Sequence, residues 1–258
     1  MKIKADYIFV KKKKNVKIVK YHKGKSKPAW IIVKDIPKGT RFINLVVGDK
    51  TKRSYSYKIW NVRTNVFIPV EFNFEAAECY YDEFSKMYDK LIKQLPKNVN
   101  VAKLMLNLLK KYRKNKKIEI LDLGAGTGII TELFAEAGYK NITLLDFSKG
   151  MLSKAKKRKS LKGCKFICQN IKELKLRKKY DVIMSFFSIG MPTYFNEEET
   201  QNILRILKTR LKKNGLLILV GYYEMPKKNP LFKTLKSGKF IPDKRRGYYF
   251  DYYIGQKK

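Results

Sequence analysis

Cysteine and histidine, which build disulfide frameworks and many metal sites, are scarce in this chain of 258 residues. The cysteines are Cys79, Cys164 and Cys168, and the single histidine is His22. Three unevenly spaced cysteines cannot form a disulfide framework or a zinc cluster, and one histidine cannot form a histidine-ligated metal centre. We therefore expect no metal site. The low cysteine content also suits a reducing cytosol.

Long apolar segments are missing as well. The longest stretch without a charged residue covers residues 182–196 and contains Pro192. It is shorter than the roughly 20 residues that a membrane-spanning helix needs. The first residues, from Met1 to Asp6, do not resemble the apolar core of a signal peptide. These absences predict a cytoplasmic protein that makes no use of a membrane.

Acidic residues are the third shortage, with 22 Asp and Glu against 59 Lys and Arg, for a net charge of +37. This balance disfavours a cationic partner and favours a polyanion or an anionic small molecule. The excess is spread along the chain, with 19 basic and 5 acidic residues in 1–75 and 40 and 17 in the remainder. Charge alone therefore does not separate RNA from a small anionic ligand.

The first 75 residues differ in pattern from the rest. Short runs rich in β-branched and aromatic residues alternate with turn and charge clusters, which is typical of a small β sandwich or barrel. Pro69, inside the last run, indicates an edge strand or a bulge. We predict a basic β-rich domain over 1–75, with strands at 7–10, 16–21, 29–33, 42–47, 55–60 and 66–74.

From residue 76 the apolar residues follow helical spacing, and strands and helices then alternate. Such alternation predicts parallel βαβ units in a doubly wound, mostly parallel α/β sheet over 76–258. The tail is expected to hold a helical turn at 230–235 and an aromatic edge strand at 248–254. The other expected helices cover 76–95, 99–113, 127–137, 148–159 and 197–211, with 96–98 as a break; the strands cover 118–123, 141–145, 164–169, 180–185 and 216–222.

The most specific segment runs from Glu119 to Gly128, reading EILDLGAGTG. Glycines between a strand and a helix allow positive φ angles and let a ligand approach the backbone, and the helix start offers N–H groups. A tight turn without a ligand is the alternative. A dinucleotide site is the nearest functional rival, but its G-x-G-x-x-G spacing differs from the spacing here. Asp122 would also repel a pyrophosphate, whereas it could accept from an ammonium or a hydroxyl.

This segment resembles the first motif, E-x-L-D-x-G-x-G-x-G, of the class I S-adenosylmethionine-dependent methyltransferases. The resemblance implies a Rossmann-like fold and S-adenosyl-L-methionine as cofactor. It continues at Asp146, 22 residues after Gly124, in a segment similar to the family's D-x-S-x-x-M-L. An acidic residue there can hold both ribose hydroxyls, although Asp146 could instead cap a helix. The implied cofactor-binding residues of these two motifs are Asp122, Gly124, Ala125, Gly126, Thr127, Gly128, Asp146, Phe147 and Met151.

Three further segments extend the resemblance. Asn170, followed by Ile171, stands where the family has an Asp that accepts from the adenine amino group; an Asx-type turn is its alternative role. Ser185 ends the fourth-strand motif. Tyr81 and Tyr88, seven residues apart, resemble the helix that many small-molecule methyltransferases fold over the cofactor, or else form an aromatic core stripe.

The fourth-strand motif bears on the acceptor. After Ser185 the chain reads FFSIG in place of the N/D-P-P-Y of the nucleobase- and amide-methylating branches, which counts against those acceptors. The leading hypothesis is methyl transfer to an unidentified small molecule. An anionic acceptor would suit the positive charge of the chain. The alternatives are a tRNA or rRNA methyltransferase that docks RNA on 1–75, and a cofactor-binding module without turnover. No catalytic residue is assigned; Tyr194, Tyr222, Tyr223 and Glu224 lie near the expected acceptor pocket.

Overall fold

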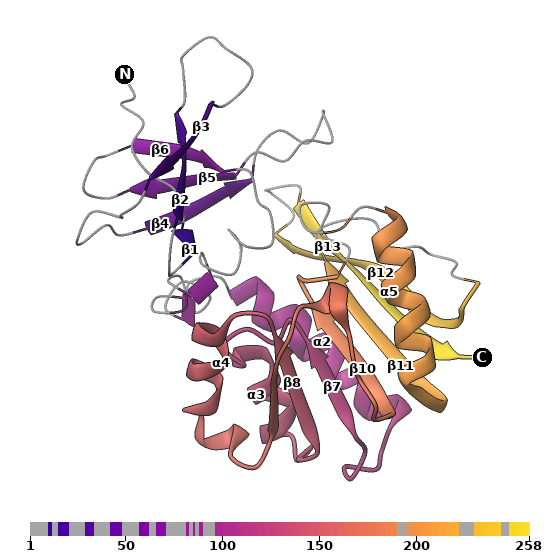
Figure 1. Cartoon of the computed structure of the whole chain (residues 1–258). Helices are drawn as coiled ribbons and strands as arrows, with labels where there is room; N and C mark the ends of the chain where they lie inside the picture. The colour runs from indigo at the N-terminus through magenta and orange to yellow at the C-terminus, as the bar shows by residue number, and fades with distance from the viewer. Residues whose placement is uncertain are drawn as a thin grey trace. The chain divides into compact units, whose positions relative to one another are not determined.

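The computed structural model describes the first part of the chain in less detail than the second (Figure 1). In the first 80 residues it describes only the backbone of six strands. In the remainder it describes residues 81, 82, 85, 88 and 89, and residues 96–258 apart from 190–194, 196, 222–229 and 244–247. The chain divides into two compact units, one of residues 1–84 with 192–194 and one of residues 85–191 with 195–258.

The first unit contains two three-stranded antiparallel sheets, ordered β1-β2-β3 and β4-β5-β6. In the described part of this unit, Pro69 lies in β6 at the edge of its sheet, opposite Lys58 of β5. A proline has no N–H to donate, so an edge is where it disturbs pairing least. The strands are β1 (Val10–Lys11), β2 (Asn15–Lys20), β3 (Ala29–Val33), β4 (Phe42–Val47), β5 (Tyr57–Asn61) and β6 (Val66–Val70).

The second unit is an alternating α/β structure. Its helices are α2 (Pro96–Tyr112), α3 (Ile129–Glu136), α4 (Lys149–Lys156) and α5 (Glu197–Arg210), with short 3₁₀ turns η2 (Lys159–Leu161) and η3 (Ile171–Glu173). Its strands are β7 (Ile120–Leu123), β8 (Ile142–Asp146), β9 (Lys165–Cys168), β10 (Tyr180–Phe186), β11 (Leu211–Gly221), β12 (Phe232–Asp243) and β13 (Tyr248–Lys257).

The seven strands form one sheet in the order β12-β13-β11-β10-β7-β8-β9. The pairs from β11 through β10, β7 and β8 to β9 are parallel, whereas β13 is antiparallel to both of its neighbours. The predicted doubly wound, mostly parallel sheet is thus confirmed. The chain leaves β7 toward β8 and later returns to β10 on the other side of β7. This reversal is the place where open α/β sheets form their ligand crevice, at the carboxyl ends of the strands.

Helices cover both faces of the sheet. Right-handed crossovers that progress from β7 to β9 put α3 and α4 on one face, and the reversed step from β10 to β11 puts α5 on the other. Alternate strand residues such as Val182 and Met184 join the core with α2 and α3, whereas α5 lies along β11 (Figure 1). Every residue of β7 and β8 is buried, as expected for parallel strands covered on both sides.

Two expectations for the tail were wrong. Residues 230–235 do not form a helical turn, because β12 begins at Phe232, which is 1% exposed. Residues 248–254 belong to β13, which is not at the edge but between β11 and β12. The aromatic residues at this end of the chain favour a strand wherever it pairs, so composition alone did not reveal that a further strand would cover it.

The expected break at residues 96–98 was also wrong, because α2 begins at Pro96 itself. Proline fits the first turn of a helix, where its fixed φ is suitable and its missing N–H would have no partner anyway. No helix in the described segments is long and apolar enough to cross a membrane.

Candidate functional site

The turn after β7 and the end of β8 are joined by a single carboxylate. Asp146, the last residue of β8, is 5% exposed. Its Oδ2 accepts from the Gly126 N–H at 2.8 Å, and its Oδ1 accepts from the Ser148 N–H at 2.9 Å. The glycine loop and Asp146 are therefore in direct contact. Asp146 does not act as the helix cap, because Ser148 takes that position and accepts from the Met151 N–H at 3.0 Å.

The three loop glycines have different surroundings, although all have positive φ. A Cβ on Gly124 would come within 2.4 Å of Ser188 Oγ, and one on Gly128 within 2.6 Å of Leu161 Cδ1. A Cβ on Gly126 would meet no heavy atom within 4 Å. Gly124 and Gly128 are thus needed for close packing of the protein itself. Gly126 is the position where the backbone borders open space into which a ligand could fit.

Most N–H groups of the loop are already used inside the protein. Gly124 and Ala125 donate to the Leu145 carbonyl at 2.8 and 3.1 Å, and Gly128 donates to the Ala125 carbonyl at 3.0 Å. With the Gly126 N–H directed to Asp146, four of the five loop N–H groups have internal acceptors. The backbone of residues 124–128 therefore presents no row of donors to a ligand. A pyrophosphate needs such donors, so the geometry weighs against a dinucleotide.

Asp122 lies within β7 and is 2% exposed. Its Oδ2 accepts from Thr131 Oγ1, on the first turn of α3, at 2.6 Å. Burial, with a smaller contribution from the negative charge of Asp146, raises the pKa of Asp122 to about 7, and the Thr131 hydrogen bond lowers it less. Asp122 is thus buried rather than open to a ligand. Its hydrogen bond with Thr131 holds the first turn of α3 against β7.

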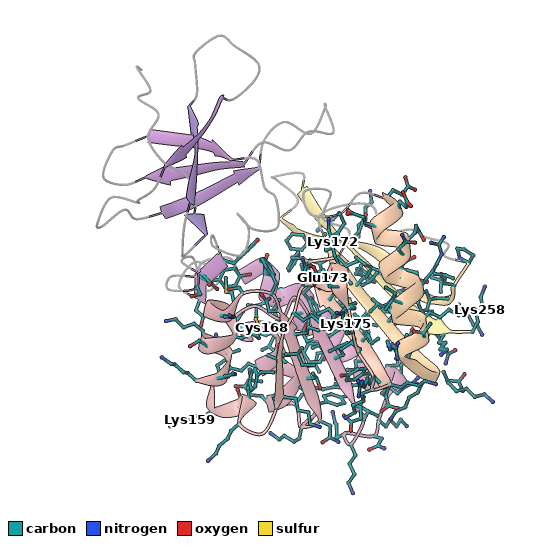
Figure 2. The ribbon with its side chains drawn as sticks, viewed as in Figure 1. Lys159, Cys168, Lys172, Glu173, Lys175 and Lys258 are labelled. Atoms are coloured by element: carbon teal, nitrogen blue, oxygen red, sulfur yellow. The ribbon has the colours of Figure 1, made fainter. Side chains whose placement is uncertain are left out.

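The other predicted cofactor residues follow the strand ends. Phe147 is half-buried directly after β8, and Met151 is 1% exposed. Asn170 follows β9, and its side-chain oxygen accepts from the Lys172 N–H at 2.9 Å, which is the Asx-type turn that we considered as its alternative role. Ile171 is buried. The surrounding segment, with Lys172 and Glu173, can be followed in Figure 2.

Ser185 ends up in the core rather than at an open surface. It is 1% exposed in β10, and its Oγ accepts from the Ile189 N–H at 3.3 Å. Phe187, two residues later, has a positive φ of 56°, so the chain turns sharply as it leaves β10. This turn brings Ser188 against Gly124. The carboxyl ends of β7 and β10 are therefore closely packed.

Tyr81 and Tyr88 are both half-buried and both helical. Tyr88 belongs to the same compact unit as the glycine loop, whereas Tyr81 falls in the unit of the N-terminal strands. The acceptor-side candidates Tyr194, Tyr222, Tyr223 and Glu224 lie outside the described residues.

Sequence reasoning missed a charged network next to the loop. Arg158 donates to Glu132 Oε2 at 2.5 Å and forms an ion pair with Asp89, while its Nε donates to the Thr127 carbonyl at 2.6 Å. Ser160 donates to the other Glu132 oxygen at 2.7 Å. These partners are far apart in sequence, and Arg158 sits in a basic run that gives no sign of a special role.

The comparisons with known proteins agree with this geometry. A family model described as a methyltransferase domain matches residues 120–215. A malonyl-[acyl-carrier protein] O-methyltransferase of Bacillus anthracis is 32% identical over 149 residues, which are 56% of this chain and 49% of that protein. The chain spans about half the length of the curated relatives it matches.

Two solved structures share the fold. The N-methyltransferase NodS of Bradyrhizobium japonicum, in complex with S-adenosyl-L-homocysteine, aligns with a TM-score of 0.53 at 11% identity. The alignment covers 63% of this chain and 88% of NodS. The magnesium protoporphyrin IX methyltransferase of Synechocystis, with bound S-adenosylmethionine, aligns with a TM-score of 0.50 at 17% identity, covering 62% and 79%.

Proposed function

Starting from the class I S-adenosylmethionine-dependent methyltransferase domain that this chain carries, we propose that the protein transfers a methyl group to an anionic small-molecule acceptor. The class expected from residues 119–128 is confirmed, together with its cofactor. The acceptor and the individual site residues are part of the proposal.

The observation that carries the proposal is the junction of Gly126 with Asp146. It puts the open loop position next to a buried carboxylate at the reversal point of the sheet. A carboxylate offers about four acceptor positions, so Asp146 could accept from ribose hydroxyls beside its backbone donors. The space beside Gly126, which a Cβ would partly fill, fits a cofactor that lies along the loop. S-adenosylmethionine supplies an already activated methyl group, so the protein mainly has to align acceptor and cofactor.

Three observations support an anionic small molecule as acceptor. The segment after Ser185 reads FFSIG rather than the N/D-P-P-Y of nucleobase and amide methylation. The net charge of +37 favours anions. The Bacillus anthracis relative is named for a malonyl group, which bears a carboxylate. An RNA acceptor is favoured by the charge alone.

The test is incubation of the full-length protein with S-adenosylmethionine labelled in its methyl group. Acceptors are offered separately: malonyl thioesters, neutral acyl thioesters of similar size, a metabolite extract and bulk tRNA. We expect label in the product of an anionic small-molecule acceptor, such as the methyl ester of a malonyl thioester, and much less label when Asp146→Ala replaces wild type. Label in tRNA alone would overturn the small-molecule proposal, and cofactor binding without transfer to any of these acceptors would favour the module without turnover.

A further inference from the structure

The Arg158 guanidinium is nearly buried, with 13% of its side chain exposed, between two carboxylates and a backbone carbonyl. One side is occupied by Glu132 of α3 and the other by Asp89. The planar guanidinium, with five N–H donors in a fixed arrangement, can bond such partners at once and hold them at defined angles. A charge this far from water is tolerated only when it is paired, so these contacts constrain where each partner can lie.

Thr127 ties the network to the glycine loop. Its Oγ1 donates to Asp89 Oδ1, while its carbonyl accepts from Arg158 Nε at 2.6 Å. Thr127 is completely buried. The two oxygens of Asp89 are therefore held by different groups, one by the loop and the other by Arg158. Thr127 immediately follows Gly126, the position that borders open space, so movement of this network would move the candidate site.

Asp89 is helical, as are its neighbours Tyr88 and Ser85 in the same compact unit. Ser85 is buried and Tyr88 half-buried. The Asp89 carboxylate is thus a direct connection between the helical residues before α2 and the turn after β7. Its loss would remove this connection without removing any group from the sheet.

We propose that Asp89 and Arg158 are positioning residues that couple the docking of the helical residues around Tyr88 to cofactor binding at the glycine loop. The inference rests on the proposed function, because it assigns the coupling to the same site. Docking and binding then stabilise each other: cofactor on the loop holds Thr127 in place, and Thr127 with Arg158 holds Asp89. Neither residue touches the reacting groups in this account.

The test compares full-length wild type with Asp89→Asn. The side chain of Asp89 is 37% exposed, so the protein with the neutral isostere Asn in its place should still fold. The matched control is Asp181→Asn, which removes another ion pair, Lys212 to Asp181 at 2.8 Å, at the start of β10 rather than at its carboxyl end. S-adenosylmethionine is titrated into each protein by calorimetry. Amide hydrogen exchange of the peptide that contains Tyr88 and Asp89 is followed with and without the cofactor.

We expect Asp89→Asn to raise the Kd for S-adenosylmethionine about tenfold, the effect of losing one charged hydrogen bond. The cofactor should slow exchange of the Tyr88 peptide in wild type and in Asp181→Asn, and not in Asp89→Asn. Equal Kd and equal protection in Asp89→Asn would overturn the coupling while leaving the proposed function intact. If wild type bound no S-adenosylmethionine at all, the proposed function and the coupling would both be wrong.

Discussion

The Gly126 N–H and the Asp146 carboxylate meet at 2.8 Å, which links the turn after β7 to the last residue of β8. Neither residue would explain the site alone. Gly126 provides open space, and Asp146 provides acceptors that are fixed by two backbone donors. Because these donors come from the loop and from the start of α4, the carboxylate is held in place before any ligand arrives.

Replacement of this carboxylate should affect cofactor binding first. Asp146→Ala removes the acceptor of the Gly126 and Ser148 N–H groups, and we expect S-adenosylmethionine binding to weaken by about 1.5–3 kcal/mol, the range for hydrogen bonds to a charged group. Calorimetry of the folded variant measures this change, with circular dichroism as the control for folding. Unchanged affinity in a folded variant would remove Asp146 from the site.

Alanine at the loop glycines should separate packing from binding. Gly124→Ala would bring a Cβ within 2.4 Å of Ser188 Oγ and should lower the Tm strongly. Gly126→Ala meets no such contact and should cost about 1–2 kcal/mol for its left-handed φ. Its Cβ would project into the space assigned to the cofactor.

We therefore expect Gly126→Ala to lose cofactor affinity far more than stability, as measured by thermal unfolding beside calorimetric titration. Gly124→Ala should show the reverse order. If both variants lost stability equally and Gly126→Ala still bound S-adenosylmethionine normally, the open space beside Gly126 would not be the cofactor site.

Asp122 should make stability depend on pH. Its pKa is raised from an ordinary value of 3.8 to about 7, chiefly by burial, so the folded state binds its proton more tightly than the unfolded state does. This contribution is fully present below pH 3.8 and is lost as the pH rises through about 7. Urea unfolding between pH 4 and pH 8 should show wild type losing stability relative to Asp122→Asn as the pH rises. Parallel curves for the two proteins would contradict the raised pKa.

The position of Asp122 also shows what the sequence could and could not predict. The glycine spacing and the interval to Asp146 were sufficient to predict a strand–turn–helix loop and the cofactor class, because both motifs are local. The partner of Asp122 is Thr131, one of many polar residues in the next helix, so nothing local distinguished a buried structural carboxylate from one that faces a ligand.

Long-range contacts set the other limits. The network of Asp89, Thr127, Glu132 and Arg158 draws on four separate segments, and no periodicity within any one of them reveals it. The same holds for β13, whose place inside the sheet depends on pairing with β12. Pro69 was predictable because the missing N–H of proline restricts its position regardless of the partner.

The charge of the N-terminal region should have little specific effect on RNA binding. Replacing Lys11 to Lys14 by serine in the full chain removes four of the 59 basic residues. If RNA attraction is non-specific, binding to bulk tRNA should stay weak and its salt dependence nearly unchanged. A specific RNA platform would instead lose affinity. The slope of log binding constant against log salt concentration would also become shallower by about 0.7 for each lost single-strand phosphate contact. Filter binding at several salt concentrations distinguishes these outcomes, and a large loss of slope would favour the RNA acceptor.

The choice of S-adenosylmethionine over a dinucleotide is the central claim, and direct competition at the loop tests it most simply. Full-length protein is titrated calorimetrically with S-adenosylmethionine, S-adenosylhomocysteine and NAD⁺, each alone and then in the presence of the others. S-adenosylmethionine and S-adenosylhomocysteine should compete for one common site. Four of the five loop N–H groups have acceptors within the protein, so few are left to hold the pyrophosphate of NAD⁺. We expect no displacement by NAD⁺, and S-adenosylmethionine binding weakened by about 1.5–3 kcal/mol in Asp146→Ala. Binding of NAD⁺ at the loop, with no heat from S-adenosylmethionine, would contradict the central claim.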